Sequence, residues 1–192
     1  MKATTNPEKI VNCLLLGDSP RGQNIPAPLK WGQRNEAVGK KLFMKGHKAI
    51  HNHVEFEEQG LYISDTYPFI GASPDGLISC KICGKFLIEI KCPYTKRNFS
   101  PKIAAKEHCF EDENKRLNLD PKSYWYSQIQ GQLGICKLDI CKLVVYTTKG
   151  VHVVDVHFDS DFWKRLEEKL VHFYLSSLGP ATMKLFEDKP VQ

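Results

Sequence analysis

The sequence predicts a mixed α/β fold in which helices flank a central β-sheet. Strand-like and helix-like segments alternate along the chain, as they do in domains that cover a sheet with helices. The strand-like segments cover residues 53–58, 61–63, 67–72, 76–80, 86–91, 140–147 and 151–157. The helix-like segments cover residues 31–45, 123–136 and 160–178.

The first helix-like segment has apolar residues at near-helical spacing, namely Trp31, Val38, Leu42 and Phe43. Gly46 is expected to end this helix. The last segment, 160–178, is amphipathic, with its apolar residues on one face. Residues 18–30 are rich in Pro and Gly and predict a loop. The polar segment 98–118 predicts some helix without defining its bounds.

Two pairs of strands are expected to form hairpins. The sequence KICGK, between 76–80 and 86–91, is typical of a tight turn. Lys149-Gly150 similarly joins the two strands near the C-terminus. One strand pair therefore precedes the helix at 123–136, and the other follows it.

Length and composition limit the class of protein. The 192 residues are 42% hydrophobic and 26% charged, which is typical of a globular domain and not of a disordered chain. The net charge of +5 permits a polyanionic partner without requiring one. The chain contains neither an apolar run of about 20 residues, as a membrane helix needs, nor a signal peptide. We therefore expect no membrane association and an intracellular location: the nucleus in a eukaryotic host, the cytoplasm in a phage or bacterial one.

The seven cysteines are expected to be reduced thiols, since secreted disulfide scaffolds are shorter and richer in cysteine. Cys80 and Cys83 form a CxxC followed by Gly84, which resembles half of a zinc knuckle. Cys92 and the His108-Cys109 pair could complete the site only by meeting it in space, so a metal-free turn is favoured. The three histidines of GHKAIHNHVEF, namely His47, His51 and His53, are expected in a surface loop.

The strand FLIEIK carries the first sign of chemistry. Because strand side chains alternate between two faces, Phe86, Ile88 and Ile90 are expected to point into a core. Leu87, Glu89 and Lys91 then share the other face. Desolvating two charges is costly, so the pair indicates a functional site unless the strand is a solvated edge with a surface ion pair.

Asp75 favours the functional interpretation. It lies in SPDG at the start of the strand that pairs with FLIEIK, so the hairpin can bring it beside Glu89. Two carboxylates held together repel each other unless a cation lies between them. Mg²⁺ is a hard cation that takes one or two carboxylates together with water and substrate phosphate. Lys91 would then lie beside the attacking water, where it could hold or deprotonate it or offset charge on the phosphate.

These residues form the pattern of the PD-(D/E)xK nucleases: Pro74-Asp75, then Glu89-Ile90-Lys91. Their surroundings are more specific. The segments LKWGQRNEAVGKKLF, GASPDGLI, LIEIKCPYTKRNF and YSQIQGQLGI occur in this order within residues 28–147. Together they resemble the phage lambda-type exonucleases and the YqaJ-like viral recombinase family. The resemblance implies a single nuclease domain over residues 1–192, either complete or cut from a larger protein.

The resemblance also implies roles for individual residues. Asp75, Glu89 and the main-chain carbonyl of Ile90 would bind the metal, and Glu36 would add a further acidic group. Lys91 would be the catalytic lysine. In the family's Gln-x-Gln pair, Gln130 would hydrogen-bond the lysine, the attacking water or the phosphate; it is preferred to Gln128, which lies on a different helix face, while Gln132 remains open.

The resemblance implies a restriction-endonuclease-like fold, with a mixed central sheet flanked by helices. It further implies an Mg²⁺-dependent deoxyribonuclease, with Mn²⁺ as a substitute, which digests one strand of duplex DNA from an end in recombination or DNA processing. A ring-shaped trimer and a single-strand annealing partner belong to the same set of expectations. The alternatives are a structure-specific or nicking endonuclease of this fold and a catalytically silent DNA-binding module.

One departure from the phage enzymes concerns the N-terminal segment. They carry an arginine ahead of a Thr-Ala-Ser-like stretch that helps to grip a DNA end. Here MKATTNPEKI stands in its place without that arginine, and Arg21 is the nearest substitute. Either the sequence is a piece of a longer protein, or a DNA end is recognised differently.

Overall fold

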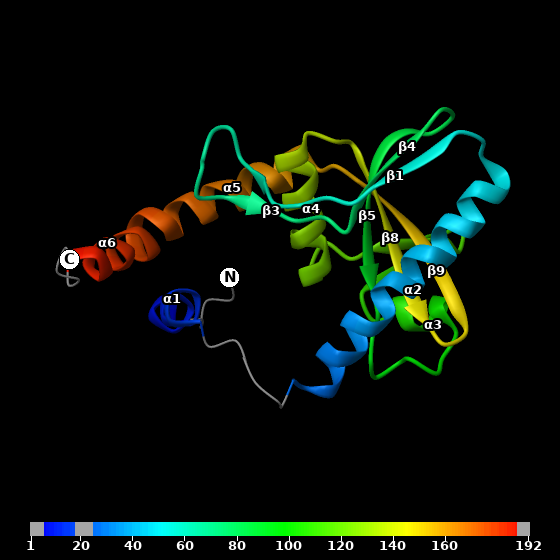
Figure 1. Cartoon of the computed structure of the whole chain (residues 1–192), viewed down its shortest axis with the longest axis horizontal. Coiled ribbons are helices and arrows are strands. Elements are labelled where there is room, and N and C mark those ends of the chain that lie inside the picture. The colour runs from blue at the N-terminus through cyan, green and yellow to red at the C-terminus, as the bar shows by residue number, and fades with distance from the viewer. Residues whose placement is uncertain (1–5, 18–24, 188–192) are drawn as a thin grey trace. The chain divides into compact units, whose positions relative to one another are not determined.

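The protein separates into two compact units in a computed structural model that describes residues 6–17 and 25–187. The larger unit contains residues 26–163, and the smaller contains the described parts of 1–25 and 164–192 (Figure 1). Arg21 and most of the expected loop at 18–30 lie outside the described residues.

A five-stranded mixed sheet forms the centre of the larger unit. Its order is β1-β4-β5-β8-β9. β5 pairs antiparallel with β4 and parallel with β8, so it is the central strand. The strands are β1 (Val54–Glu57), β4 (Gly76–Cys80), β5 (Gly84–Lys91), β8 (Ile140–Thr147) and β9 (Gly150–His157).

Helices cover both faces of this sheet (Figure 1). α2 (Ala27–Ile50) packs on one face, where the β5 residues Phe86, Ile88 and Ile90 are buried. α3 (Pro101–Ala105) and α4 (Tyr124–Cys136) contribute to the core on the other face, which includes Leu87. The expected alternation of β5 is therefore confirmed, and both of its faces are buried.

Two short hairpins extend from this framework. β2 (Tyr62–Ile63) pairs with β3 (Gly71–Ala72), and β6 (Cys109–Glu111) pairs with β7 (Leu117–Leu119). The first hairpin leads directly into the SPDG segment.

The smaller unit is helical. It contains α1 (Pro7–Leu16), most of α5 (Ser160–Phe173), a π-helical turn η1 (Tyr174–Leu178) and α6 (Gly179–Glu187). Asn6 caps α1 by accepting a hydrogen bond from the backbone N–H of Glu8, and Gly17 ends the helix with a φ of 64°. The sequence patterns predicted neither α1 nor α6.

Most predicted elements are confirmed, and the main differences concern where they end. The strands at 76–80 and 140–147 coincide with β4 and β8, and both hairpins form. The strand expected at 67–72 is reduced to Gly71–Ala72. The segment 98–118 contains α3, β6 and part of β7. No helix in the described part of the chain is long and apolar enough to cross a membrane.

The first helix differs most from the prediction. α2 begins at Ala27, inside the expected loop, and passes through Gly46 to Ile50. A glycine in a helix costs about 1 kcal/mol relative to alanine. Burial of Phe43 and His47 on either side of Gly46 offsets this cost, because packing of an amphipathic face outweighs local propensity. His47 is therefore a buried helical residue, and its expected place in a surface loop is wrong.

Candidate active site

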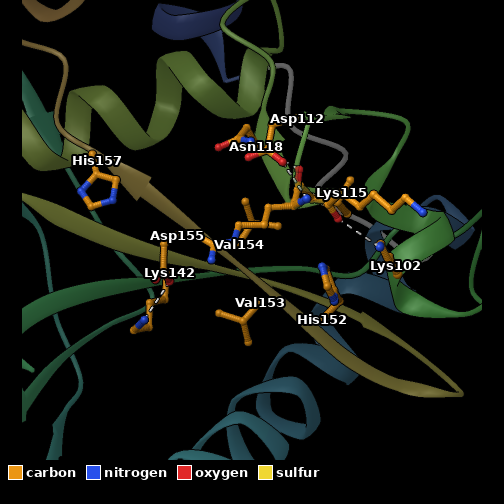
Figure 2. Close-up of a pocket in the computed structure, with 12 residues that line it drawn as sticks. Lys102, Asp112, Lys115, Asn118, Lys142, His152, Val153, Val154, Asp155 and His157 are labelled. Carbon is orange, nitrogen blue, oxygen red and sulfur yellow. Dashed lines mark hydrogen bonds and ion pairs between the residues drawn. The ribbon is translucent and has the colours of Figure 1, made fainter.

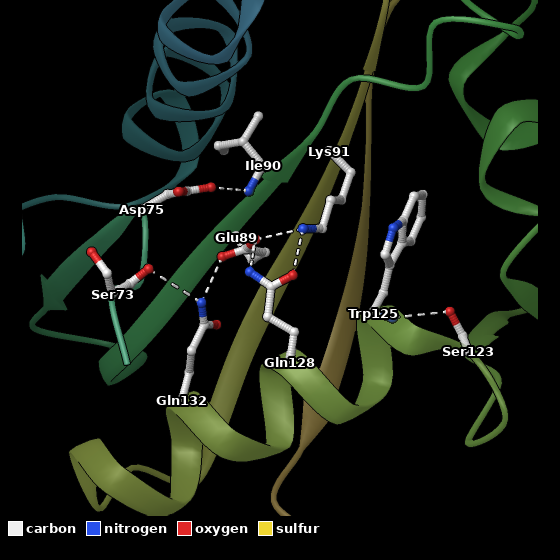
Figure 3. Close-up of polar contacts among 9 residues, drawn as sticks. All are labelled: Ser73, Asp75, Glu89, Ile90, Lys91, Ser123, Trp125, Gln128 and Gln132. Carbon is white, nitrogen blue, oxygen red and sulfur yellow. Dashed lines mark hydrogen bonds and ion pairs between the residues drawn. The ribbon is translucent and has the colours of Figure 1, made fainter. Parts of the chain in front are cut away.

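Asp75 and β5 meet where the β4–β5 hairpin opens toward the C-terminal end of β5. Gly76 pairs with Ile88, so Asp75 lies one residue beyond the last pair of the ladder. Its Oδ2 accepts a hydrogen bond of 2.6 Å from the backbone N–H of Ile90 (Figure 3). The hairpin thus brings Asp75 to the segment that contains Glu89, as the sequence predicted.

Glu89 is a buried carboxylate in the central strand. Only 3% of the residue is exposed, and the Nζ of Lys91 donates a hydrogen bond of 2.7 Å to its Oε1. The Lys91 side chain is 19% exposed. A solvated edge strand with a surface ion pair is therefore excluded. A buried charge needs such partners, because desolvation costs more than a single weak contact returns.

Two glutamines of α4 complete the contacts of Glu89 (Figure 3). The Nε2 of Gln128 donates to Glu89 Oε1 at 2.7 Å, and its Oε1 accepts from Lys91 Nζ at 2.7 Å. The Nε2 of Gln132 donates to Glu89 Oε2 at 2.8 Å. Both carboxylate oxygens and the lysine are thereby oriented by one helix. Residues four apart share a helix face, and this spacing is the signal that could have found the pair in the sequence.

The position expected for Gln130 requires a correction. Gln130 is fully buried and turned away from Glu89: its Nε2 donates to the His157 carbonyl and its Oε1 accepts from the Asp159 N–H, both at 2.8 Å. It therefore joins α4 to the end of β9. An offset of two residues rotates a side chain by about 200° around a helix, which is why Gln128 and Gln130 cannot face the same site.

The electrostatics of the cluster reflect a concentration of carboxylates. Burial and the nearby Glu89 raise the pKa of Asp75 to about 7. The N–H of Ile90 and the charge of Lys91 act in the opposite direction, and Glu36 raises this pKa further. Glu36 lies on α2 and is partly buried. Burial raises the pKa of Cys92 to about 12, and the negative charge of Glu36 contributes to this rise. The four charged groups predicted from the sequence therefore lie close enough to interact.

The kinds of donor group in this cluster match those that a hard divalent cation takes. Asp75, Glu89 and Glu36 supply carboxylate oxygens, the kind of ligand that Mg²⁺ and Mn²⁺ prefer. The raised pKa of Asp75 indicates uncompensated negative charge in a desolvated place, which a cation would relieve. Asp75, Glu89, Glu36 and the Ile90 carbonyl are the groups that would hold the ion.

The start of α4 is positioned by a capping residue and a stacked ring. The Oγ of Ser123 accepts from the backbone N–H of Trp125 at 3.2 Å (Figure 3). His108 stacks on Trp125 with ring centroids 3.7 Å apart, and its Nδ1 lies 2.9 Å from Ser123 Oγ. These contacts fix the helix end that precedes Gln128 by one turn.

A cavity of about 670 Å³ lies away from this cluster, over β9 and the β6–β7 hairpin (Figure 2). Its lining includes Lys102, Lys115, Arg116 and His152, and it contains none of the predicted site residues. Lys102 also forms an ion pair of 3.1 Å with Glu111. The cavity is therefore basic and separate from the carboxylate cluster.

Comparisons with known proteins identify a matching family and solved structures of similar fold. The family described as the YqaJ-like viral recombinase domain matches residues 15–139, well over half of the chain. Comparison with proteins of curated function finds no match.

Solved structures share the fold. The alkaline exonuclease LHK-Exo from Laribacter hongkongensis is 22% identical, with a TM-score of 0.65 over 94% of this chain and 81% of that one. Its complex with dAMP gives a TM-score of 0.67 at the same identity, over 93% and 80% of the two chains. A phage-related exonuclease from Haemophilus somnus 129PT is 11% identical, with a TM-score of 0.52 over 87% and 77%. The predicted restriction-endonuclease-like α/β fold is thereby confirmed.

Proposed function

The chain belongs to the YqaJ-like viral recombinase domain family, and on that premise we propose that it is a divalent-metal-dependent DNA exonuclease that acts on duplex ends. One observation carries the proposal. Glu89 is buried in the central strand and accepts hydrogen bonds from Lys91 and two glutamines. Asp75 accepts a hydrogen bond from the backbone N–H of the next residue, Ile90. Buried charged groups are costly to maintain, and they are typical of functional sites.

Each residue has a distinct part in the proposed reaction. Asp75, Glu89, Glu36 and the Ile90 carbonyl would hold Mg²⁺, or Mn²⁺ in its place. When bound there, such an ion would supply Lewis-acid chemistry, making a water molecule more acidic and offsetting charge on the phosphate. Lys91 presents its ammonium group to the attacking water and the scissile phosphate. Gln128 fixes the direction of the Lys91 amine, since it accepts from Nζ while it donates to Glu89.

The substrate class rests on the family and on the shared fold. The three solved structures described above are named as exonucleases, and one was solved with dAMP. For this chain, exonucleolytic digestion of duplex DNA during recombination is a proposal drawn from that likeness. A ring-shaped trimer and a single-strand annealing partner are proposed on the same ground. We also propose that residues 1–192 act as one nuclease domain.

A structure-specific or nicking endonuclease would use the same chemistry on another DNA shape. One assay separates the possibilities: end-labelled linear duplex and closed circular DNA, each incubated with Mg²⁺ and with EDTA. Loss of the linear DNA alone, with Mg²⁺ alone, is the expected result. Cutting of the circle would replace the exonuclease by an endonuclease. Binding of both DNAs without cleavage would identify a catalytically silent module and reject the enzyme.

A further inference from the structure

Four side chains with metal-binding atoms gather at the opposite end of the β4–β5 hairpin. They are His47, His51, Cys80 and Cys83, and their ligand atoms all lie within 4.8 Å of one another. From the sequence we expected the cysteines in a metal-free turn and the histidines in a surface loop. His47 and His51 instead supply the two further ligands that the CxxC pair requires. Neither Cys92 nor the His108-Cys109 pair belongs to the group.

Two rigid elements present these ligands. His47 lies in the last turn of α2, and His51 follows as its C-cap, donating its backbone N–H to the His47 carbonyl at 3.0 Å. Their rings are stacked with centroids 4.4 Å apart, so both face the same side. Cys80 ends β4, and Cys83 closes the turn into β5. Gly84 follows with a φ of 77°, a conformation that favours glycine.

His47 provides an independent sign of a binding site. Only 8% of this residue is exposed, and its Nε2 is buried without a hydrogen-bond partner among the described residues. A buried polar atom left without a partner is unfavourable, and such atoms are rare in folded proteins. A metal ion bound to Nε2 would satisfy it, because the neutral imidazole nitrogen offers a lone pair.

The separation of Cys83 and His51 is close to that of two ligands of a tetrahedral ion. The Sγ of Cys83 lies 3.7 Å from Nδ1 and 3.8 Å from Nε2 of His51. With bonds of about 2.3 Å to sulfur and about 2.05 Å to nitrogen, a tetrahedral zinc site has S···N edges of about 3.6 Å. The backbone N–H of Cys83 points to the Cys80 sulfur at 3.4 Å, so the turn already provides a donor for a thiolate.

We propose that His47, His51, Cys80 and Cys83 bind a structural zinc ion. Two thiolates and two imidazoles are a ligand set that zinc prefers, and the spacings HxxxH and CxxC are typical of zinc sites. Two thiolates balance the charge of Zn²⁺, so the site requires no further counter-ion. Four protein ligands leave no open coordination position, so this zinc takes no part in cleavage.

The ion would join the C-terminal end of α2 to the β4–β5 turn. Glu36 lies in the N-terminal half of the same helix, and Asp75, Glu89 and Lys91 lie at the open end of the same hairpin. Zinc would therefore hold the two supports of the candidate active site together, at a place remote from the carboxylates along both elements. Its expected effect is on folding stability, because a site assembled only in the folded chain stabilises that state.

The test measures metal content of the full chain. The protein is purified from zinc-containing medium, dialysed against metal-free buffer and analysed by plasma mass spectrometry. We expect about one zinc per chain in the wild type, and almost none in Cys83→Ser and His51→Ala. Cys13→Ser and His53→Asn are matched controls, since both alter exposed residues outside the cluster. Asp75→Asn should keep its zinc, which distinguishes this site from the candidate active site.

A second measurement uses the wild type alone and does not depend on how the variants fold. Zinc-free protein titrated with Co²⁺ should develop thiolate-to-cobalt charge-transfer bands and the intense visible bands of tetrahedral cobalt. A wild type that cannot be loaded with zinc, a Cys83→Ser variant that retains it, or a weak octahedral cobalt spectrum would each overturn the proposal. Loss of zinc from Asp75→Asn would overturn it as well, since the ion would then belong to the carboxylates.

Discussion

The two ends of the β4–β5 hairpin differ in the kinds of ligand atoms that they offer to a cation. At one end, carboxylates of Asp75 and Glu89 meet a lysine and two amides, and Lys91 remains partly exposed. At the other end, two thiols and two imidazoles gather at the end of α2. Hard oxygen ligands suit a cation that exchanges water and phosphate, whereas sulfur and nitrogen suit an ion that stays.

The comparison teaches how one hairpin can serve reactivity and stability separately. At the carboxylate end, burial and the negative charge of Glu89 raise the pKa of Asp75 to about 7. At the Cys/His end, α2 packs against the hairpin through a shared apolar core that includes Phe43, Cys80 and Phe86. Substitutions at the first end should therefore change the rate of cleavage, and those at the second should change stability.

The largest expected effect follows loss of a carboxylate. Asp75→Ala or Glu89→Ala removes a charged ligand of the proposed Mg²⁺ and several kcal/mol of transition-state stabilisation, a loss of about 10³-fold or more in rate. Binding to DNA should persist, because backbone affinity comes mainly from lysine and arginine. Cleavage assays and gel-shift titrations on the same samples check both points. Cleavage near the wild-type rate by either variant would reject the site.

Lys91→Met should slow cleavage by about 10²–10³-fold, the usual cost of removing one well-aimed electrostatic stabiliser. Metal binding should largely persist, since Asp75, Glu89 and the Ile90 carbonyl remain. Single-turnover cleavage and metal titration of one preparation measure the two effects. A surface ion pair contributes only about 0–1 kcal/mol. A rate within about threefold of the wild type would therefore mean that Lys91 is not catalytic.

The glutamines of α4 provide a smaller and more selective contrast. Gln128→Ala removes contacts to both Lys91 and Glu89 and should lower the single-turnover rate by about tenfold, equivalent to about 1.4 kcal/mol. Gln130→Ala should instead lower the free energy of unfolding by about 1–3 kcal/mol, because the His157 carbonyl and the Asp159 N–H lose their partner. Urea unfolding and cleavage per folded molecule compare the two. A slower cleavage rate for Gln130→Ala, together with a loss of stability alone for Gln128→Ala, would assign Gln130 and not Gln128 to the site.

The smallest effect on cleavage is expected at the Cys/His end. Cys83→Ser should lower Tm by several degrees through loss of zinc, yet cleave within about threefold of the wild type at temperatures where it is folded. Scanning calorimetry with and without a zinc chelator checks the first part, since only the wild type should respond. A large loss of rate in a fully folded Cys83→Ser sample would show that the two ends are coupled.

Local patterns were sufficient for much of the fold and for the centre of the site. Alternation in FLIEIK gave the two faces of β5 correctly, because side-chain direction in a strand depends only on position. The KICGK turn brought Asp75 to the backbone of Ile90, since a hairpin fixes which residues face each other. Helix ends were less predictable: α2 continues past Gly46 because Phe43 and His47, on either side of this glycine, are buried.

The sequence by itself determined that Asp75, Glu89 and Lys91 lie close together, since these residues belong to one hairpin whose geometry is local. Only the tertiary structure decided which glutamines join them. Packing of Ile129 and Leu133 sets the rotation of α4, and that rotation turns Gln128 and Gln132 toward Glu89.

The tertiary structure also decided that the CxxC turn meets two histidines. The ligands of that cluster come from segments far apart in the chain, and their meeting depends on how α2 packs across the sheet. Spacing within a segment specifies a face, whereas the partner of that face is determined by the packing of the whole unit.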